Sequence, residues 1–370
     1  MIDQEILCHI WLASVLGYGS KHPVQLIEKY GSAYNAVVAG KEELLFGVEA
    51  EKYMQAFKNP DFTYAKYILD KCKNDNISVL CYQDEAYPAL LKEIPNPPSV
   101  LFYRGDLSLL KRMPFTVVGR RKMNAEGKQI LDMFVPALQK AGFTIVSGFA
   151  EGAEASLHRN YEKTVAVLPC GINVNYPTSN AGLKRQIVEK GGLVITEFMH
   201  DVNAFKGNFH LRNRLLAGLS YGVLVTQAGA KSGTSITATA AGDYGRPIYA
   251  VPGSILDVSF KGCNEMIRLG AIPVTDPNHI ILDYSPLYSE ISAPLMVEEK
   301  SPGVLNLIDS KYNDLSDDEL AILKCISGGR VHPDEITVRT GIDISMVNSV
   351  LTLLQMQELI IETDGLYSII

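Results

Sequence analysis

The stretch from residue 115 to 283 alternates short apolar segments with longer amphipathic ones, and this alternation limits the possible folds more than any other feature. The segments 115–119, 143–148 and 222–226 are apolar along almost their whole length. Strands of this kind are covered on both faces, as in a parallel sheet between two layers of helices. The sequence therefore predicts an α/β fold, a doubly wound parallel sheet, with helices over 125–140, 153–160, 180–190, 210–219 and 235–243.

The regions before this stretch predict a helical domain and an added sheet edge. In residues 1–72, apolar positions recur at spacings of three and four, which is the pattern of helices. We interpret this part as a helical domain of the sterile-alpha-motif (SAM) or helix-hairpin-helix kind. Its segment Leu16-Gly17-Tyr18-Gly19 is either a turn of a small bundle or a turn that meets a phosphate. Residues 77–105 alternate short strands with proline turns, so they are expected to extend the sheet of the next domain, 75–285.

The last part of the chain predicts an acidic linker, 286–310, and a winged-helix domain, 311–370. The expected elements of this domain are helices over 319–326, 334–340 and 345–355 and a hairpin around Asp364-Gly365. The expected recognition helix, 345–355, contains no Lys or Arg. Because phosphate contacts need cations, we interpret the domain as a protein-contact module rather than a reader of DNA.

The distribution of charge points to the central domain as the place for an anionic ligand. The net charge is −7 over the whole chain, yet residues 112–285 carry a net +5, whereas residues 1–111 carry −3 and residues 311–370 carry −6. A polyanion that binds this chain is therefore expected to bind the central block.

Small and glycine-bearing turns follow the predicted strands, and they are expected to share one edge of the sheet. The first turn, 119–122, places three cations directly after a strand. The segment 231–235, Lys-Ser-Gly-Thr-Ser, supplies amides, hydroxyls and one cation, as phosphate-binding loops do. Because carboxyl ends of parallel strands meet at one edge and helices begin there, this edge is expected to bind a polyanion or nucleotide.

The segment 206–220 contains several side chains suited to binding a phosphate or a base. It is expected to begin as a glycine-hinged loop and to become a helix near His210. Arg212 and Arg214 present forked donors suited to phosphate or carboxylate, and Phe209 offers a surface for a stacked base. The alternative is a helix start whose arginines pair with nearby acids.

Several kinds of chemistry are not indicated. The sequence has no Gly-x-Gly-x-x-Gly fingerprint after its first strand, no Walker spacing and no Cys-x-x-Cys pair. His158 and His210 stand singly and are expected to be structural, and the six cysteines are expected to be reduced. We therefore expect no cofactor and no metal, and no set of catalytic side chains stands out. Without a signal peptide or an apolar segment long enough to span a bilayer, a cytoplasmic protein with no membrane partner is expected.

The order of these motifs resembles that of the DNA-processing protein A family (DprA, also called Smf). The resemblance covers residues 80–275 well. The motifs that carry it are Tyr87-Pro88, Pro97-Pro98-Ser99-Val100-Leu101, Val118-Gly119-Arg120-Arg121-Lys122, Ser147-Gly148-Phe149-Ala150-Glu151-Gly152, Gly207-Asn208-Phe209, Arg212-Asn213-Arg214, Gly218-Leu219-Ser220, Ser232-Gly233-Thr234, Val251-Pro252-Gly253, Gly262-Cys263-Asn264 and Ile267-Arg268-Leu269-Gly270-Ala271.

The resemblance implies a fold and a function. For the fold it implies an extended Rossmann-like form of the doubly wound parallel sheet. For the function it implies a non-enzymatic recombination mediator that binds single-stranded DNA, protects incoming DNA, forms a homodimer and loads the RecA recombinase in natural transformation. By matching position, Arg121 corresponds to an arginine that contacts phosphate, Lys206 to a basic position, and Phe209 to the aromatic that meets a base. The candidate DNA-binding residues are Gly119, Arg120, Arg121, Lys122, Ser147, Gly148, Lys206, Asn208, Phe209, Arg212, Asn213, Arg214, Lys231, Ser232, Gly233 and Thr234.

The chain departs from the family pattern at a few positions. Arg120 stands where the family has serine, Glu151 where it usually has arginine, Glu154 where it has aspartate, and Gln227 where it usually has glutamate. The segment 159–164 is several residues short. Glu151 is expected to place an anion beside the phosphate path, and Arg120 is expected to add a compensating cation.

Two other functions stay open at this point. Phosphoribohydrolases of the lysine-decarboxylase-like type share this kind of sheet, and they carry a glutamate after a Pro-Gly-Gly-x-Gly-Thr loop. The corresponding stretch here, 229–237, has no acid, so a glycosidic cleavage lacks an obvious carboxylate. The third function is a scaffold that acts through the acidic winged helix alone.

Overall fold

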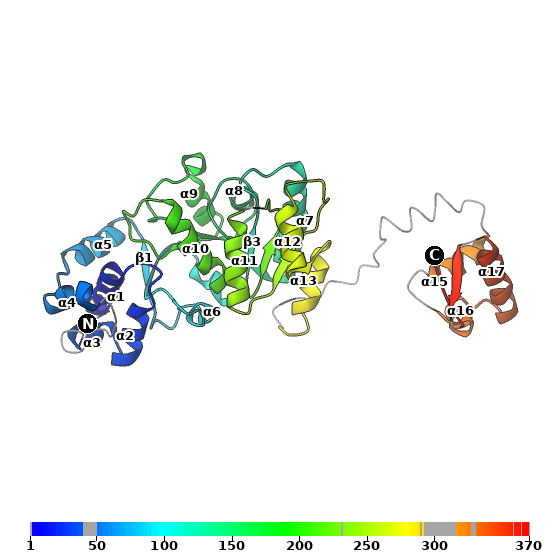
Figure 1. Ribbon diagram of the computed structural model, residues 1–370, viewed down its shortest axis with the longest axis horizontal. Coiled ribbons are helices and arrows are strands. Elements are labelled where there is room, and N and C mark those ends of the chain that lie inside the picture. The colour runs from blue at the N-terminus through cyan, green and yellow to red at the C-terminus, as the bar shows by residue number, and fades with distance from the viewer. Residues whose placement is uncertain are drawn as a thin grey trace. The chain divides into compact units, whose positions relative to one another are not determined.

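The computed structural model describes residues 2–39, 50–230, 232–288, 291, 316–326, 331–357, 359–363 and 365–369. The chain forms two compact units, Met1–Pro294 and Leu295–Ile370 (Figure 1). The predicted domain boundary near residue 72 lies inside the first unit, and it stays a prediction. The predicted linker, 286–310, falls outside the described residues except at 286–288 and 291.

The first unit is built on a mixed sheet whose strand order is β1-β2-β6-β5-β4-β3-β7-β8-β9 in the described residues. From β6 to β9 neighbouring strands are parallel, whereas β2 is antiparallel to β6 and β1 to β2. The predicted parallel sheet with an added edge is thus confirmed. The strands are β1 (Ser78–Cys81), β2 (Val100–Gly105), β3 (Met113–Val118), β4 (Phe143–Ser147), β5 (Val165–Val167), β6 (Leu193–Thr196), β7 (Val223–Val225), β8 (Ile248–Ala250) and β9 (Ile272–Pro273).

The inner strands β3 and β4 are buried along their whole length. Phe115 on β3 lies at the centre of one core and packs edge-on against Phe143 and Tyr284. The strands alternate with helices that cover both faces. These helices are α6 (Ala89–Lys92), α7 (Ala125–Ala141), α8 (Ala153–Asn160), α9 (Leu183–Glu189), α10 (Lys206–Gly218), α11 (Thr234–Asp243), α12 (Lys261–Arg268) and α13 (Pro277–Tyr284), and short 3-10 turns lie at Leu107–Lys111 and Thr178–Asn180.

The N-terminal helices share a second core with the β1 side of the sheet. Trp11, Phe57 and Ile68 belong to the same buried cluster as Phe102 of β2 and Val194 of β6. The helical character predicted for this region is confirmed. Its helices are α1 (Ile2–Leu16), α2 (His22–Tyr30), α3 (Ala33–Ala39), α4 (Ala50–Lys58) and α5 (Thr63–Asn74).

Helix α10 begins four residues earlier than the sequence predicts. Lys206 and Gly207, which were expected in a loop, form its first turn after the extended residue Phe205. A Cβ at Gly207 would lie 2.8 Å from the ring of Phe205. The glycine therefore makes room for a neighbouring ring at the start of a helix and is not a hinge.

The second unit is a helix-turn-helix followed by a hairpin. Gly341 ends the second helix in the left-handed conformation, and the Asp343 side chain accepts a 2.9 Å hydrogen bond from the amide of Ser345 to begin the third. The predicted winged-helix elements are confirmed in the described residues. They are α15 (Asp317–Ile326), α16 (Pro333–Thr340), α17 (Ile344–Met356), β10 (Ile360–Thr363) and β11 (Leu366–Ile369).

Substitutions at two glycines can show how closely the end of β2 approaches the neighbouring backbone. Gly105, with φ +103°, ends β2, and a Cβ there would lie 2.1 Å from the carbonyl oxygen of Gly192. Gly270 has nearly the same φ, +107°, and no atom within 4 Å of its Cβ position. We expect Gly270→Ala to lower the free energy of unfolding by about 1 kcal/mol through backbone strain. Gly105→Ala should lower it by about 1–3 kcal/mol more through the added clash, as measured by urea unfolding. Equal losses would contradict the close approach of β2 and Gly192.

Candidate nucleic-acid interface

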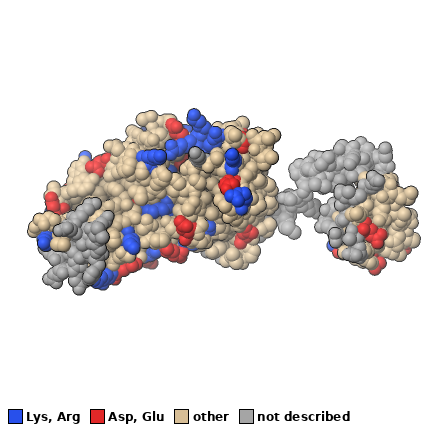
Figure 2. Space-filling view, viewed as in Figure 1, with Lys and Arg blue, Asp and Glu red and all other residues tan. Residues whose placement is uncertain are grey.

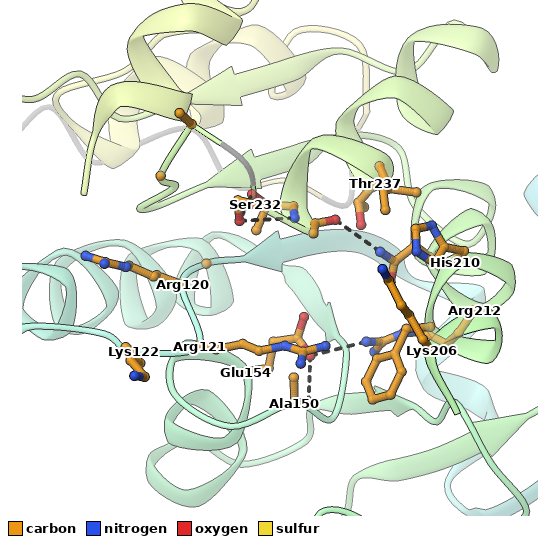
Figure 3. A pocket seen from close by; sticks show the side chains of 18 of the residues that line it. Arg120, Arg121, Lys122, Ala150, Glu154, Lys206, His210, Arg212, Ser232 and Thr237 are labelled. Carbon is orange, nitrogen blue, oxygen red and sulfur yellow. Dashed lines mark hydrogen bonds and ion pairs between the residues drawn. The ribbon is translucent and has the colours of Figure 1, made fainter. Parts of the chain in front are cut away.

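A pocket of about 750 Å³ opens where the parallel strands end (Figure 3). Its walls come from the turn after β3, the start of α8, the first two turns of α10 and the segment 229–237. Eleven of the sequence candidates line it, which places most of the predicted site in one cavity. They are Gly119, Arg120, Arg121, Lys122, Lys206, Phe209, Arg212, Asn213, Ser232, Gly233 and Thr234.

Phe209 is a half-buried ring in the first turn of α10. The guanidinium of Arg121 lies 4.8 Å from its ring centre, and that of Arg212 lies at 5.8 Å. Tyr176 meets the ring edge-on at 5.8 Å between centroids. Two cations thus lie close to the ring, a favourable arrangement because an aromatic face carries negative potential.

Arg212 forms the floor of the pocket and is only 1% exposed. It donates a 2.9 Å hydrogen bond from Nη1 to the carbonyl of Val167, at the end of β5, and Nη2 lies 3.4 Å from Oε2 of Glu154. The same carboxylate oxygen accepts a 2.7 Å hydrogen bond from the amide of Ala150. Burial lowers the pKa of Arg212, and the nearby charge of Glu154 opposes this lowering.

Gly148 explains how this ion pair fits beneath the pocket. A Cβ on Gly148 would lie 1.8 Å from Nη1 of Arg212 and 2.2 Å from Oε2 of Glu154. A side chain here would occupy the space of the ion pair. Gly148 thus shapes the floor from below and is not among the lining residues.

The free positive charge of the pocket comes from other residues. Arg121, Lys122 and Lys206 are exposed, and Arg120 is half-buried. In Figure 3, Arg121 points toward Arg212 and Arg120 points the opposite way. Figure 2 shows Lys and Arg atoms gathered in the region of α8 and α9. A cavity with this lining attracts phosphate groups.

The segment before α11 closes the other wall. Ser232 Oγ accepts hydrogen bonds from the amide and the hydroxyl of Thr234, at 3.3 and 2.8 Å. Asn213 donates a 3.2 Å hydrogen bond from Nδ2 to the carbonyl of Gly233 and so ties α10 to this wall. Lys231, another candidate, lies outside the described residues.

Three candidates make their observed contacts inside the protein. Ser147 is fully buried and donates a 2.7 Å hydrogen bond to the carbonyl of Val117. Asn208 is 1% exposed and donates to the carbonyl of Asn203 at 3.1 Å. Arg214 is buried and pairs with the carboxylate of Glu197. These residues and Gly148 are absent from the described pocket lining, so their contact with DNA stays a prediction.

The alternative weighed for the segment 206–220 therefore holds for both arginines. Arg212 pairs with Glu154 and Arg214 with Glu197, on different sides of α10. Arg212 still reaches the cavity, because its pair forms the floor.

Sequence reasoning missed some of the lining residues. Tyr176, His210 and Thr237 all face the pocket, although His210 was expected to be structural. Thr237 follows Thr234 by one helical turn, so the spacing could have indicated it. Tyr176 lies beyond the end of β5 in an irregular segment, and no pattern in the sequence pointed to it.

The structure also shows the contacts of the residues that depart from the family pattern. Glu151 does not line the pocket as described, and it accepts a 2.5 Å hydrogen bond from the hydroxyl of Ser179. Gln227 is buried beneath the pocket and donates to Asn124 and to Ser259, at 2.8 and 3.0 Å. Glu154 fulfils a structural role as the partner of Arg212.

His158 is structural, as predicted. It is fully buried, with Nε2 2.8 Å from the carbonyl of Gly148 and Nδ1 2.8 Å from the hydroxyl of Thr164. A carbonyl can only accept, so the neutral ring donates from Nε2 and accepts at Nδ1.

A Rossmann-like sheet with a basic, aromatic pocket at its carboxyl edge, followed in the chain by a winged helix, defines a class of α/β protein suited to bind a polyanion. The family model described as "DNA recombination-mediator protein A" matches residues 78–285, and the "DprA winged helix domain" model matches residues 309–365. The chain therefore belongs to the DNA recombination-mediator protein A (DprA/Smf) family, which confirms the resemblance seen in the sequence.

Individual relatives agree with this assignment. The chain is 37% identical to the "DNA processing protein DprA" of Streptococcus pneumoniae over 205 residues, 54% of this chain and 72% of that protein. It is 37% identical to the "Protein Smf" of a Synechocystis species over 221 residues, 58% of this chain and 55% of that protein.

Two solved structures are similar. The X-ray structure of DprA from Streptococcus pneumoniae matches with a TM-score of 0.63 and 30% identity, covering 75% of this chain and 97% of that one. A DprA structure from Helicobacter pylori matches with a TM-score of 0.52 and 29% identity, covering 57% of this chain and 97% of that one. Its title concerns the single-stranded DNA binding mode of that protein.

The helices in the described part of the chain are all too short or too polar to cross a membrane.

The buried histidine gives a pH-dependent prediction. Burial lowers the pKa of His158 from 6.5 to about 4. Between these values the unfolded chain binds a proton that the folded chain does not, so the free energy of unfolding should fall as the pH drops. The loss should reach about 3 kcal/mol near pH 4, measured by urea unfolding at a series of pH values. His158→Gln, which cannot titrate, should show a shallower dependence on pH. Parallel curves for the two proteins would show that His158 is not the cause.

Proposed function

We propose that this protein binds single-stranded DNA in the pocket at the carboxyl edge of its sheet, and that it passes the strand to a RecA-type recombinase. The observation that carries the proposal is the convergence of Arg121, Lys206 and Phe209 on one cavity. These residues come from two elements far apart in the sequence, and they supply the two features that single-strand binding needs. These features are cations for the backbone and an aromatic face for a base.

We infer that the cations of the pocket have different roles. Arg121 and Lys206 are exposed at the pocket and neutralise phosphates, whereas Arg212 is already paired with Glu154 and lies 5.8 Å from the centre of the Phe209 ring. The guanidinium of Arg121 lies over the ring of Phe209. A base that stacks on that face displaces the guanidinium, which is then free to meet a phosphate.

The wider role follows from the family. Members include proteins named for DNA processing, and the structure from Helicobacter pylori is titled for its binding of single-stranded DNA. For this chain we propose a cytoplasmic homodimer that protects incoming strands and loads RecA during natural transformation. Two linked pockets would bind one strand more tightly through effective concentration. The acidic winged-helix unit, with its uncharged recognition helix, serves as a protein-contact module.

A nucleotide-cleaving enzyme is the weaker candidate. Among the described lining residues the carboxylate is Glu154, and it is engaged by Arg212 and by the amide of Ala150. A general acid or base needs a freer carboxylate than this.

The salt dependence of binding separates the two kinds of contact. Arg121→Ala and Lys206→Ala should each weaken binding to a fluorescent oligo-dT and reduce the slope of log K against log salt by about 0.7. Phe209→Ala should lower the binding free energy by about 1–3 kcal/mol with little change in slope. Fluorescence anisotropy at several salt concentrations measures both quantities.

Matched controls lie away from the pocket. Arg268, 68% exposed at the end of α12 and paired with Glu265, controls for Arg121, and Lys73 on α5 controls for Lys206. Arg268→Ala and Lys73→Ala should leave affinity and slope close to those of the unmodified protein. If all three pocket variants bind as the controls do, single strands do not bind in this pocket.

Loading of the recombinase is tested separately. Added to strands coated with a single-strand-binding protein, the full chain should shorten the lag before RecA begins DNA-dependent ATP hydrolysis. The double variant Arg121→Ala/Lys206→Ala should not shorten it, because the mediator must hold the strand. An unchanged lag with the unmodified chain would reject the mediator role while leaving DNA binding intact.

A further inference from the structure

The loop between β8 and α12 carries three aliphatic side chains that point into solvent. Ile255 is 91% exposed, Leu256 88% and Val258 72%. Aliphatic side chains this exposed are individually unremarkable, but three within four residues form an apolar surface that water solvates poorly. We call Ile255, Leu256 and Val258 the apolar knuckle.

The loop that carries the knuckle is a turn held by several hydrogen bonds. The amide of Asp257 donates to the carbonyl of Ser254 at 3.0 Å, and the Asp257 side chain accepts from the amide of Ser259 at 2.7 Å. At its base, the Asn264 side chain both accepts from and donates to the backbone of Gly253, at 3.2 and 2.9 Å. These bonds fix the loop so that its aliphatic residues cannot fold back into the core.

Phe260 also holds the loop in place by packing into the core. It is 1% exposed, and a Cβ on Gly253 would lie 2.1 Å from its Cγ. The chain therefore buries Phe260, two residues after Val258, and leaves the knuckle itself outside. The exposure is a consequence of the local packing.

The knuckle adjoins the DNA pocket. The carbonyl oxygen of Val258 lies 3.6 Å from the Cβ position of Gly229, and Gly229 lines the pocket. Ser259 accepts the 3.0 Å hydrogen bond from Gln227, which lies below the same edge. The knuckle thus begins where one wall of the pocket ends.

Arg120 links the two surfaces electrostatically. It lines the pocket, points away from Arg121 in Figure 3, and its charge acts on the carboxylate of Asp257 within the knuckle. The pKa of Asp257 is held below its ordinary value first by hydrogen bonds from Ser259 and then by Arg120. A cation of the pocket lining is therefore directed away from Arg121 and close enough to the loop for its charge to act on Asp257.

We propose that single-stranded DNA leaving the pocket passes Arg120 and rests its bases on Ile255, Leu256 and Val258. This inference rests on the proposed function and extends the site beyond the pocket. Unpaired bases expose apolar faces that gain by contact with an apolar surface, whereas the faces of paired bases are stacked inside a duplex. The knuckle therefore also favours single strands over duplex DNA.

The test uses oligo-dT of increasing length, from about 4 to about 16 nucleotides, the range over which single-strand-binding sites extend. The variant is Ile255→Ser/Leu256→Ser/Val258→Ser in the full chain. Because all three side chains are exposed, we expect this variant to fold normally. We expect unchanged affinity for the shortest strands and a loss of about three- to tenfold for the longest, with an unchanged salt slope. Leu269→Ser, at a position 71% exposed at the other end of α12, is the matched control and should bind all lengths normally.

The outcomes separate this inference from the proposed function. If the unmodified chain binds no oligo-dT at all, the proposed function fails together with the inference. If it binds, and the triple variant matches it at every length, the inference alone fails. Sedimentation of both proteins without DNA completes the test. A change of oligomeric state in the triple variant would show that the knuckle contacts a second copy of the chain, which also overturns the inference.

Discussion

The site depends on a buried ion pair. Arg212 and Glu154 lie beneath the pocket, and each is held by a backbone group at the end of a strand or in the loop that follows one. Removing one partner of such a pair leaves an uncompensated charge in the interior, at a cost of about 3–5 kcal/mol. The pair therefore fixes α10 relative to β5, and Phe209, one helical turn before Arg212, takes its place at the pocket wall.

The opposite side of α10 is held by a second pair and by the N-terminal region. Arg214 pairs with Glu197 after β6, and Tyr18 packs against Phe198 at 4.8 Å between ring centroids. A Cβ on Gly19 would lie 2.7 Å from Cδ2 of Leu211. The glycine turn that the sequence left open between a bundle turn and a phosphate contact packs instead against α10. The N-terminal helices thus help to position the helix that bears Phe209.

The two buried arginines explain why the charge count of the segment 206–220 overstates its charge at the surface. Their guanidinium groups are neutralised by Glu154 and Glu197, so the positive potential of the cavity comes from the exposed cations Arg121, Lys122 and Lys206 and from Arg120. The buried arginines hold the scaffold together, and the exposed cations are the ones that our proposal assigns to the ligand. A linear sequence does not distinguish these roles, because both kinds occur in similar motifs.

By itself the sequence determined the parallel sheet, the presence of an added edge, the helical N-terminus and the winged helix, because apolar periodicity and turn residues report local structure and burial directly. The antiparallel direction of that edge came from the structure. It also brought the turn after β3 and the start of α10 to one edge, since strand order in a doubly wound sheet places their ends together. Only the tertiary structure decided which side chains reach the cavity. Ser147, Asn208 and Arg214 turn inward, whereas Tyr176 and His210 turn toward the pocket. The direction of a side chain depends on contacts between segments far apart in the chain, and the spacing of residues within one segment does not encode those contacts.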